Sequence, residues 1–203
     1  MQDNNNIYDD LLESMCFLSV DEFRYKLLNA VHNGFDVNYQ REKENIKRTL
    51  LTESFIEIEP PACDMLKVLI DCGANVNVQL NDSRMTPLMI CVQGALSKQY
   101  EITQTLLTAG ADPNAQSLDG TTAFSICAKW YCIHGGKYSD ILQLLLKAGA
   151  NPFLCRDWET LAATHKNSFH APKNMIYKII EEIIDHKKEI AAQKNIQVYM
   201  YDL

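Results

Sequence analysis

Apolar residues recur at helical spacing in successive runs along the chain, and each run ends in a turn of nearly the same composition. The four turns read Gly34-Phe-Asp-Val-Asn38, Gly73-Ala-Asn-Val-Asn77, Gly110-Ala-Asp-Pro-Asn114 and Gly149-Ala-Asn-Pro-Phe153. Their glycines lie 39, 37 and 39 residues apart. Glycine ends a helix readily because it can adopt the left-handed conformation. A period of this size predicts stacked units that share one elongated core.

Each period divides into two helices and a polar connection. Short first helices are predicted to open at residues 49–52, 86–89 and 122–125, each beginning with threonine. Second helices are predicted at 63–70, 101–107 and 140–146, each running into its glycine turn. The polar segments after the turns are too short for a helix and favour tight hairpins. Two helices precede these units, one with apolar residues from Ile7 to Leu18 and one over residues 21–33.

The C-terminal part of the sequence continues the pattern. Residues 156–163 predict another first helix, and residues 175–184 predict a long partner helix with an isoleucine stripe and a charged outer face. Such a face is typical of a terminal repeat, which meets solvent where a neighbour would be. We therefore expect an N-terminal capping helix at 1–19, a repeat domain at 20–185, and the end of a C-terminal helix with a tail at 186–203. The expected units are about 20–40, 47–81, 82–117, 118–155 and 156–185.

One unit carries a recognisable motif. It reads Thr-Pro-Leu, then small residues, then a second helix ending in Leu-Leu-x-x-Gly-Ala-Asp-x-Asn, and residues 84–114 match it best. This pattern resembles the ankyrin repeat. The resemblance implies an all-α, ankyrin-like helix-turn-helix solenoid with short hairpin fingers, about four to five repeats and helical caps at both ends.

The sequence departs from the family pattern in two ways. The histidine that follows Thr-Pro-Leu in the family is replaced by Thr52, Met89 and Ser125, and by Ala163 if the last unit aligns at Thr160. Its hydrogen bonds between neighbouring hairpins are therefore expected to be missing or replaced. The period also exceeds the 33 residues of the family. We place the surplus between the two helices, at residues 94–100 and 131–138, on the edge opposite the hairpin tips.

Composition narrows the choice of partner and compartment. Asp and Glu outnumber Lys and Arg by 26 to 19, which argues against nucleic acid and favours a basic protein partner. Seven cysteines without regular spacing fit a reducing compartment. The polar N-terminus does not resemble a secretory signal, and no stretch approaches the ~18 apolar residues of a membrane helix. We expect a cytoplasmic protein, in its own cell or in a host cell, with no membrane association.

The strongest alternative chemistry centres on Cys127, Cys132 and His134, residue types that bind zinc or act as nucleophiles. Their spacing fits no standard metal motif, and Cys127 falls where the repeat requires a small core residue, as Cys91 does one unit earlier. Buried cysteine behaves as a small hydrophobic residue. The sequence therefore favours packing, with no catalytic residue, metal or cofactor, and keeps a metal- or thiol-dependent enzyme as the alternative.

The resemblance also implies where a partner binds. In the family, hairpin tips and the exposed side of each first helix line a concave groove. Carried over to this chain, the tips are 79–85, 116–120 and 156–159, with 41–47 as a longer first finger, and Glu53 is a helix position facing the groove. The partner-binding residues that we predict are Arg84, Ile90, Gln93, Leu118, Ile126, Lys129, Trp130, Arg156 and Trp158. The two tryptophans stand out because tryptophan is enriched among interface hot spots and the repeat pattern gives these positions no packing role.

These observations predict a non-enzymatic module that binds another protein through its concave face and blocks or scaffolds it. We expect a monomer in isolation. The same surface would serve a microbial effector or an immunity-type inhibitor, and the acidic charge slightly favours the inhibitor because it steers the protein toward a basic target.

Overall fold

The computed structural model describes residues 4–56, 58, 63–94, 96–134, 138–152 and 154, without the side chains of 132–134. The elements in chain order are α1 (Asn4–Phe17), α2 (Val20–His32), β1 (Arg41–Lys43), β2 (Ile46–Arg48), α3 (Leu50–Ile56), α4 (Cys63–Asp71), α5 (Pro87–Gln93), α6 (Gln99–Thr108), α7 (Ala123–His134) and α8 (Ser139–Lys147). The helices predicted over 156–163 and 175–184 lie outside the described residues.

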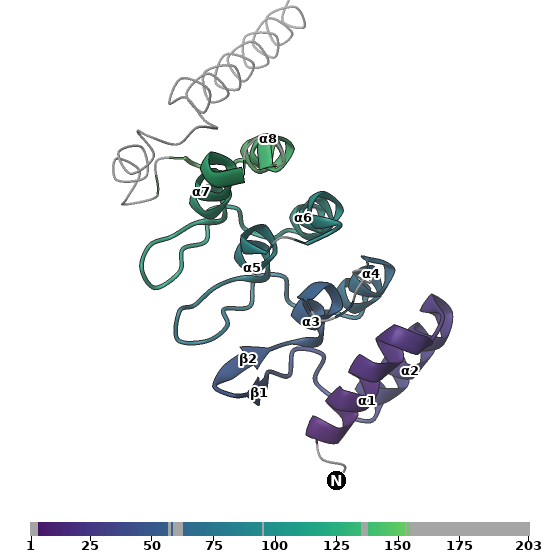
Figure 1. Ribbon diagram of the computed structural model, residues 1–203. Coiled ribbons are helices and arrows are strands. Elements are labelled where there is room, and N and C mark those ends of the chain that lie inside the picture. Colours follow the sequence, from purple (N-terminus) through teal and green to yellow (C-terminus); the bar gives the residue numbers. More distant parts are fainter. Residues whose placement is uncertain are drawn as a thin grey trace, which may run out of the picture.

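The helices form two stacked rows (Figure 1). Helices α1, α3, α5 and α7 contact one another in sequence and form the inner row, and α2, α4, α6 and α8 do the same in the outer row. The connections that precede α3, α5 and α7 project as fingers beside the inner row (Figure 1). This arrangement confirms the stacked units predicted from the period and the all-α, ankyrin-like solenoid that the resemblance implies.

The first helices begin where the sequence predicts, one residue after a threonine. Thr86 is the N-cap of α5, and its hydroxyl accepts a hydrogen bond from the backbone N–H of Met89 at 3.4 Å. Thr122 accepts in the same way from Ser125 N–H at 3.2 Å, and Ser125 Oγ donates to the carbonyl oxygen of Thr122 at 2.8 Å. These bonds satisfy backbone groups that a helix start leaves unpaired.

The hydrogen bonds of the missing histidine are replaced locally. Thr52 Oγ1 donates to the carbonyl oxygen of Thr49 at 2.9 Å and accepts from its N–H at 3.1 Å, as Ser125 does with Thr122. Met89 has no side-chain hydroxyl and takes part only through its backbone N–H. The Thr52 and Ser125 hydroxyls, which stand at the position of the family histidine, therefore form hydrogen bonds inside their own unit.

The units are joined instead by the asparagine that ends each glycine turn. The Asn77 side chain donates to the carbonyl oxygen of Gly110 at 2.9 Å and accepts from Asp112 N–H at 2.7 Å. Asn38 makes the equivalent pair with Gly73 and Asn75, and Asn114 with Gly149 and Asn151. The four glycines have φ between +88° and +95°, a region that side chains disfavour. Each of the last three turns therefore presents the same backbone groups to the asparagine of the turn before it.

The apolar core is continuous along the stack. Residues such as Leu11, Leu51, Leu88 and Phe124 on the inner helices and Leu66 on α4 are at most 1 % exposed and belong to one cluster. A repeat buries its apolar face against its neighbours, so the core runs the length of the solenoid.

The surplus length between paired helices differs from the prediction. Helix α7 extends to His134, so the first part of the segment 131–138 is helical, because Tyr131 is buried and continues the inner-row packing. In the equivalent segment 94–100, helix α6 already begins at Gln99. The Gln99 amide donates to the carbonyl oxygen of Cys91 at 2.9 Å and so holds the connection against the end of α5.

We expect Asn77→Ala to lower the free energy of unfolding by about 1–2 kcal/mol, because it removes two hydrogen bonds between units. Urea denaturation followed by circular dichroism measures the change. Gln104→Ala, an exposed position on α6, is the matched control and should change stability by less than about 0.5 kcal/mol. Equal effects of the two variants would show that the bridge does not stabilise the stack.

Candidate functional site

Three fingers stand beside the inner helices. The first is an antiparallel hairpin in which Arg41 pairs with Arg48 and Lys43 with Ile46. Its two turn residues, Glu44 and Asn45, both have positive φ, as a two-residue turn between twisted strands requires. The second finger closes at the bridge between Leu80 and Met85, and the third at the bond from Ser117 N–H to the carbonyl oxygen of Thr121 at 3.0 Å.

Neighbouring fingers are hydrogen-bonded to one another. The N–H of Leu118 in the third finger donates to the carbonyl oxygen of Ser83 in the second at 2.8 Å. The N–H of Lys47 in the first finger donates to the side-chain oxygen of Asn81 in the second. The fingers therefore form one preformed surface, which limits the conformational entropy that a partner would have to remove on binding.

Two repeat positions on the inner helices carry the residues predicted to face the groove. Glu53, Ile90 and Ile126 share one position of the repeat, and Gln93 and Lys129 share another. Gln93 and Lys129 are exposed, and Ile90 is half-buried. Ile126 is only 9 % exposed and belongs to the core cluster. Of the two predicted apolar contact residues on these helices, Ile126 is therefore mostly covered and Ile90 is partly accessible.

The predicted residues at the finger tips are accessible. Arg84 is exposed with φ 57°, and its Nε–H donates to Gln79 Oε1 at 2.8 Å, which orients the guanidinium along the second finger. Leu118 is 69 % exposed at the third tip. The Leu118 backbone is held by its hydrogen bond to Ser83, so the exposed side chain offers apolar surface to a partner without being needed for the core.

Trp130 has a packing role that the sequence interpretation did not give it. The ring is half-buried and stacks against Tyr138, with centroids 6.4 Å apart and planes at 23°. Arg156 and Trp158 lie outside the described residues. Arg84, Gln93, Leu118 and Lys129 are exposed and Ile90 is half-buried, whereas Trp130 packs against Tyr138 from within α7.

A charged hollow of about 260 Å³ lies at the first finger. It is lined by Leu12, Arg41, Lys43, Glu44, Ile46, Arg48 and Glu53. Glu53 is only 5 % exposed, and Arg48 Nη1 lies 3.3 Å from its Oε2. Arg41 Nη2 lies 2.9 Å from Asp9 Oδ1 on α1. Sequence reasoning assigned Glu53 to the groove, whereas the structure buries it against an arginine.

Tyr8 lies close to the charged residues that line this hollow. It is 0 % exposed, and the Arg41 guanidinium carbon is 5.7 Å from its ring centroid. Burial raises the pKa of the Tyr8 hydroxyl well above its usual range, and the nearby Glu53 carboxylate raises the pKa further. Sequence reasoning missed Tyr8 and Arg48, because contacts of α1 and α3 with the first finger are not readable from the repeat pattern.

The cysteine and histidine alternative gains no support from the described residues. Cys127 is buried, burial raises its pKa, and its Sγ lies 3.7 Å from the carbonyl oxygen of Tyr138. Burial also raises the pKa of Cys91 to about 12. The side chains of Cys132 and His134 lie outside the described part, and within that part no three His, Cys, Asp or Glu residues gather as metal ligands. The buried thiols of Cys91 and Cys127 fit the packing interpretation.

Comparison with known proteins concerns most of the described repeat region. Residues 20–117 and 63–155 match a family model described as ankyrin repeats, in three copies. A search of curated proteins found no match. Across the described residues, no helix has the length and apolar character needed to cross a membrane.

We expect thiol reactivity to follow burial. In the native protein at pH 8, iodoacetamide should label exposed Cys16 rapidly and should label Cys91 and Cys127 only after unfolding, because the thiolate is the reactive form. Peptide mass spectrometry with and without denaturant measures each site. Labelling of native Cys127 as fast as that of Cys16 would instead favour the thiol-based alternative.

Proposed function

The chain belongs to the ankyrin-repeat family, and on that premise we propose that it is a non-enzymatic module that binds another protein through its finger and inner-helix face. Ankyrin repeats are in general protein-interaction modules. The observation that carries the proposal is the row of fingers tied to one another by the Leu118–Ser83 and Lys47–Asn81 hydrogen bonds. A surface fixed in advance binds with a smaller loss of conformational freedom.

The proposed contact residues are side chains that the fold leaves accessible on this face. Leu118 supplies exposed apolar area at a tip, and Ile90 supplies a half-buried apolar patch beside it. Arg84, Gln93 and Lys129 supply polar and cationic groups around them. Such an arrangement, with apolar anchors inside a polar rim, is the usual anatomy of a protein interface.

The remaining predicted residues contribute less to the proposed contact surface. Trp130 stacks on Tyr138 and would present only part of its ring to a partner. Ile126 supports the face from beneath, since it is nearly buried. Arg156 and Trp158 would extend the face if the unit expected at 156–185 continues the stack.

The mode of action that we propose is occupation of a partner's surface, which blocks or scaffolds that partner. An effector or an immunity-type inhibitor would use the same face. The net charge of −7 favours faster association with a basic target. A preformed surface supports rigid docking, in which the interface backbone moves by about 1 Å or less.

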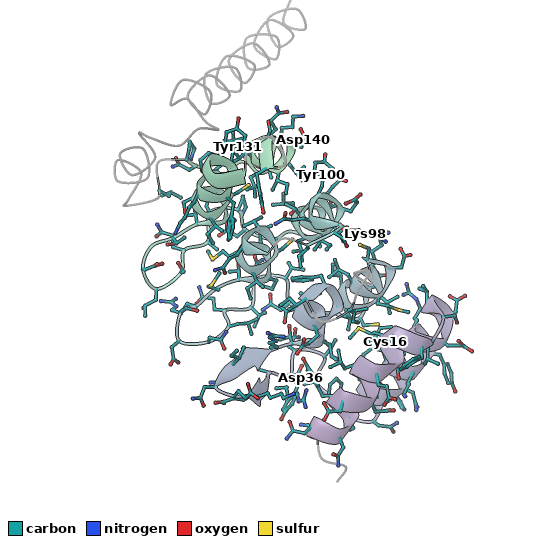
Figure 2. All side chains as sticks on the ribbon, viewed as in Figure 1. Cys16, Asp36, Lys98, Tyr100, Tyr131 and Asp140 are labelled. Atoms are coloured by element: carbon teal, nitrogen blue, oxygen red, sulfur yellow. The ribbon has the colours of Figure 1, made fainter. Side chains whose placement is uncertain are left out.

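Photo-crosslinking tests which face is used. A benzoylphenylalanine at position 118, on the third finger, should give an adduct with a partner protein in the native cell. The same residue at position 100 should give none, because Tyr100 lies on outer helix α6, away from the fingers (Figure 2). Adducts from position 100 alone would place the binding surface on the outer helices and contradict the proposal.

Once crosslinking has identified the partner, a charge-reversal substitution measures how much the finger and inner-helix face contributes to the binding affinity. Lys129→Glu should weaken binding about tenfold, because it reverses the charge at a contact where the partner's surface is complementary to a cation, whatever the overall charge of the partner. Lys147→Glu makes the same change at an exposed position of outer helix α8 and should stay within twofold of the unmodified protein. Isothermal calorimetry gives both affinities, and equal losses would indicate a long-range charge effect in place of a contact.

A further inference from the structure

The first finger concentrates positive charge on one of its faces. In an antiparallel pair, directly opposed residues share a face, as do residues two apart on one strand. The register Arg41–Arg48 and Lys43–Ile46 therefore places Arg41, Lys43, Ile46 and Arg48 together, and all four line the hollow. Lys47 and its partner Glu42 take the opposite face. Three cations thus meet at one cavity in a chain whose net charge is −7.

Carboxylates on the neighbouring helices pair with the two arginines. Asp9 on α1 contacts Arg41 at 2.9 Å, and the nearly buried Glu53 on α3 contacts Arg48 at 3.3 Å. Two like charges directly opposite each other on a hairpin are otherwise destabilising. Lys43 is exposed and has no ion-pair partner among the residues that the structure describes. Lys43 is therefore the lining cation that no described carboxylate pairs with, although the Glu44 carboxylate also lines the hollow.

A buried polar atom beside the same charges lacks a partner. The Tyr8 hydroxyl is fully buried and makes no hydrogen bond within the described part of the chain. Its electrostatic neighbours include Glu53, Arg41 and Arg48, all of which line the hollow. Buried hydroxyls nearly always have a hydrogen-bond partner. Tyr8 is not among the lining residues, so its hydroxyl belongs to the polar surroundings of the hollow and is not itself a contact for a ligand.

We propose that this hollow binds a carboxylate, the side chain of an aspartate or glutamate on the protein partner, an inference that rests on the proposed function. Arg41 and Lys43 supply the attraction, and Arg48, held by Glu53, forms the far wall. Arginine presents several N–H donors in a planar fork that matches a carboxylate. A doubly charged phosphate fits less well, because Glu53 and Glu44 both line the hollow and repel the second charge.

The hollow is continuous with the proposed binding face. Glu53 occupies the repeat position that Ile90 holds one unit later and Ile126 two units later. The first finger is also bonded to the second through Lys47 and Asn81. A partner lying along the fingers would therefore bring one of its side chains to this pocket at the N-terminal end of the face.

The test uses a single-carboxylate probe on the full chain labelled with ¹⁵N. N-acetyl-glutamate N′-methylamide is titrated at constant ionic strength while backbone amide shifts are recorded. We expect saturable shifts at residues 41–48 with a Kd of about 1–20 mM, the strength of one small charged fragment. The glutamine analogue, which has the same shape without the charge, should give no saturable shift. Methyl phosphate, as the competing anion, should bind more weakly.

Matched variants identify the residues responsible. Arg41→Gln and Lys43→Gln should each weaken probe binding about fivefold or more. Lys47→Gln removes the same charge from the opposite face of the hairpin and should stay within twofold. Lys43→Gln should not disturb the fold, because the Lys43 side chain is exposed. It therefore remains a valid test if Arg41→Gln disturbs the contact with Asp9.

Three outcomes would overturn the proposal. They are equal responses to the glutamate and glutamine probes, tighter binding of methyl phosphate, and an equal effect of Lys47→Gln and Lys43→Gln. The titration contains no partner protein, so its failure leaves the crosslinking result at position 118 intact. Saturable glutamate binding without any crosslink at position 118 would instead support the pocket and count against the proposed function.

Discussion

The structure depends on the interface between successive units, where an asparagine at the end of one glycine turn bonds the backbone of the next. Asn38, Asn77 and Asn114 each satisfy one carbonyl and one N–H of the following turn. A single unit is too small to bury its apolar face alone, so its stability comes from its neighbours. The bridges align those neighbours at the turn, and the shared core then places the fingers side by side.

That constraint separates the residues that build the stack from those available for recognition. The glycines, asparagines and threonine caps repeat because the backbone of each unit requires them. The side chains of Gln93, Lys129, Arg84 and Leu118 are instead exposed and contribute little to packing. The first finger differs from the others because it is a regular hairpin with cations on one face. At physiological ionic strength, charges are screened beyond about 8 Å. The finger can therefore attract an acidic side chain even though the chain as a whole is acidic.

Most of the repeat architecture could be predicted from the sequence. The threonines mark the starts of α3, α5 and α7, and the glycine turns mark the ends of the outer helices. Prediction failed where a residue's partner comes from another element. Glu53 has a groove position in the repeat but is buried against Arg48. Trp130 has no packing role in the repeat but stacks on Tyr138. Tyr131 extends α7 because it enters the core, which the repeat length could not indicate.

The repeated unit, its two helices, its turn and the stacking of one unit on the next can be read from the sequence, because they follow from local backbone chemistry repeated at a fixed period. The side chains that meet across units are set by the packing of the helices: the asparagine bridges, the bonds between fingers, and the meeting of Arg41, Arg48 and Glu53 at one hollow near Tyr8. Those contacts join residues more than thirty positions apart in most cases. Their geometry depends on how the helices and the first finger pack, and a period along the chain carries no information about that.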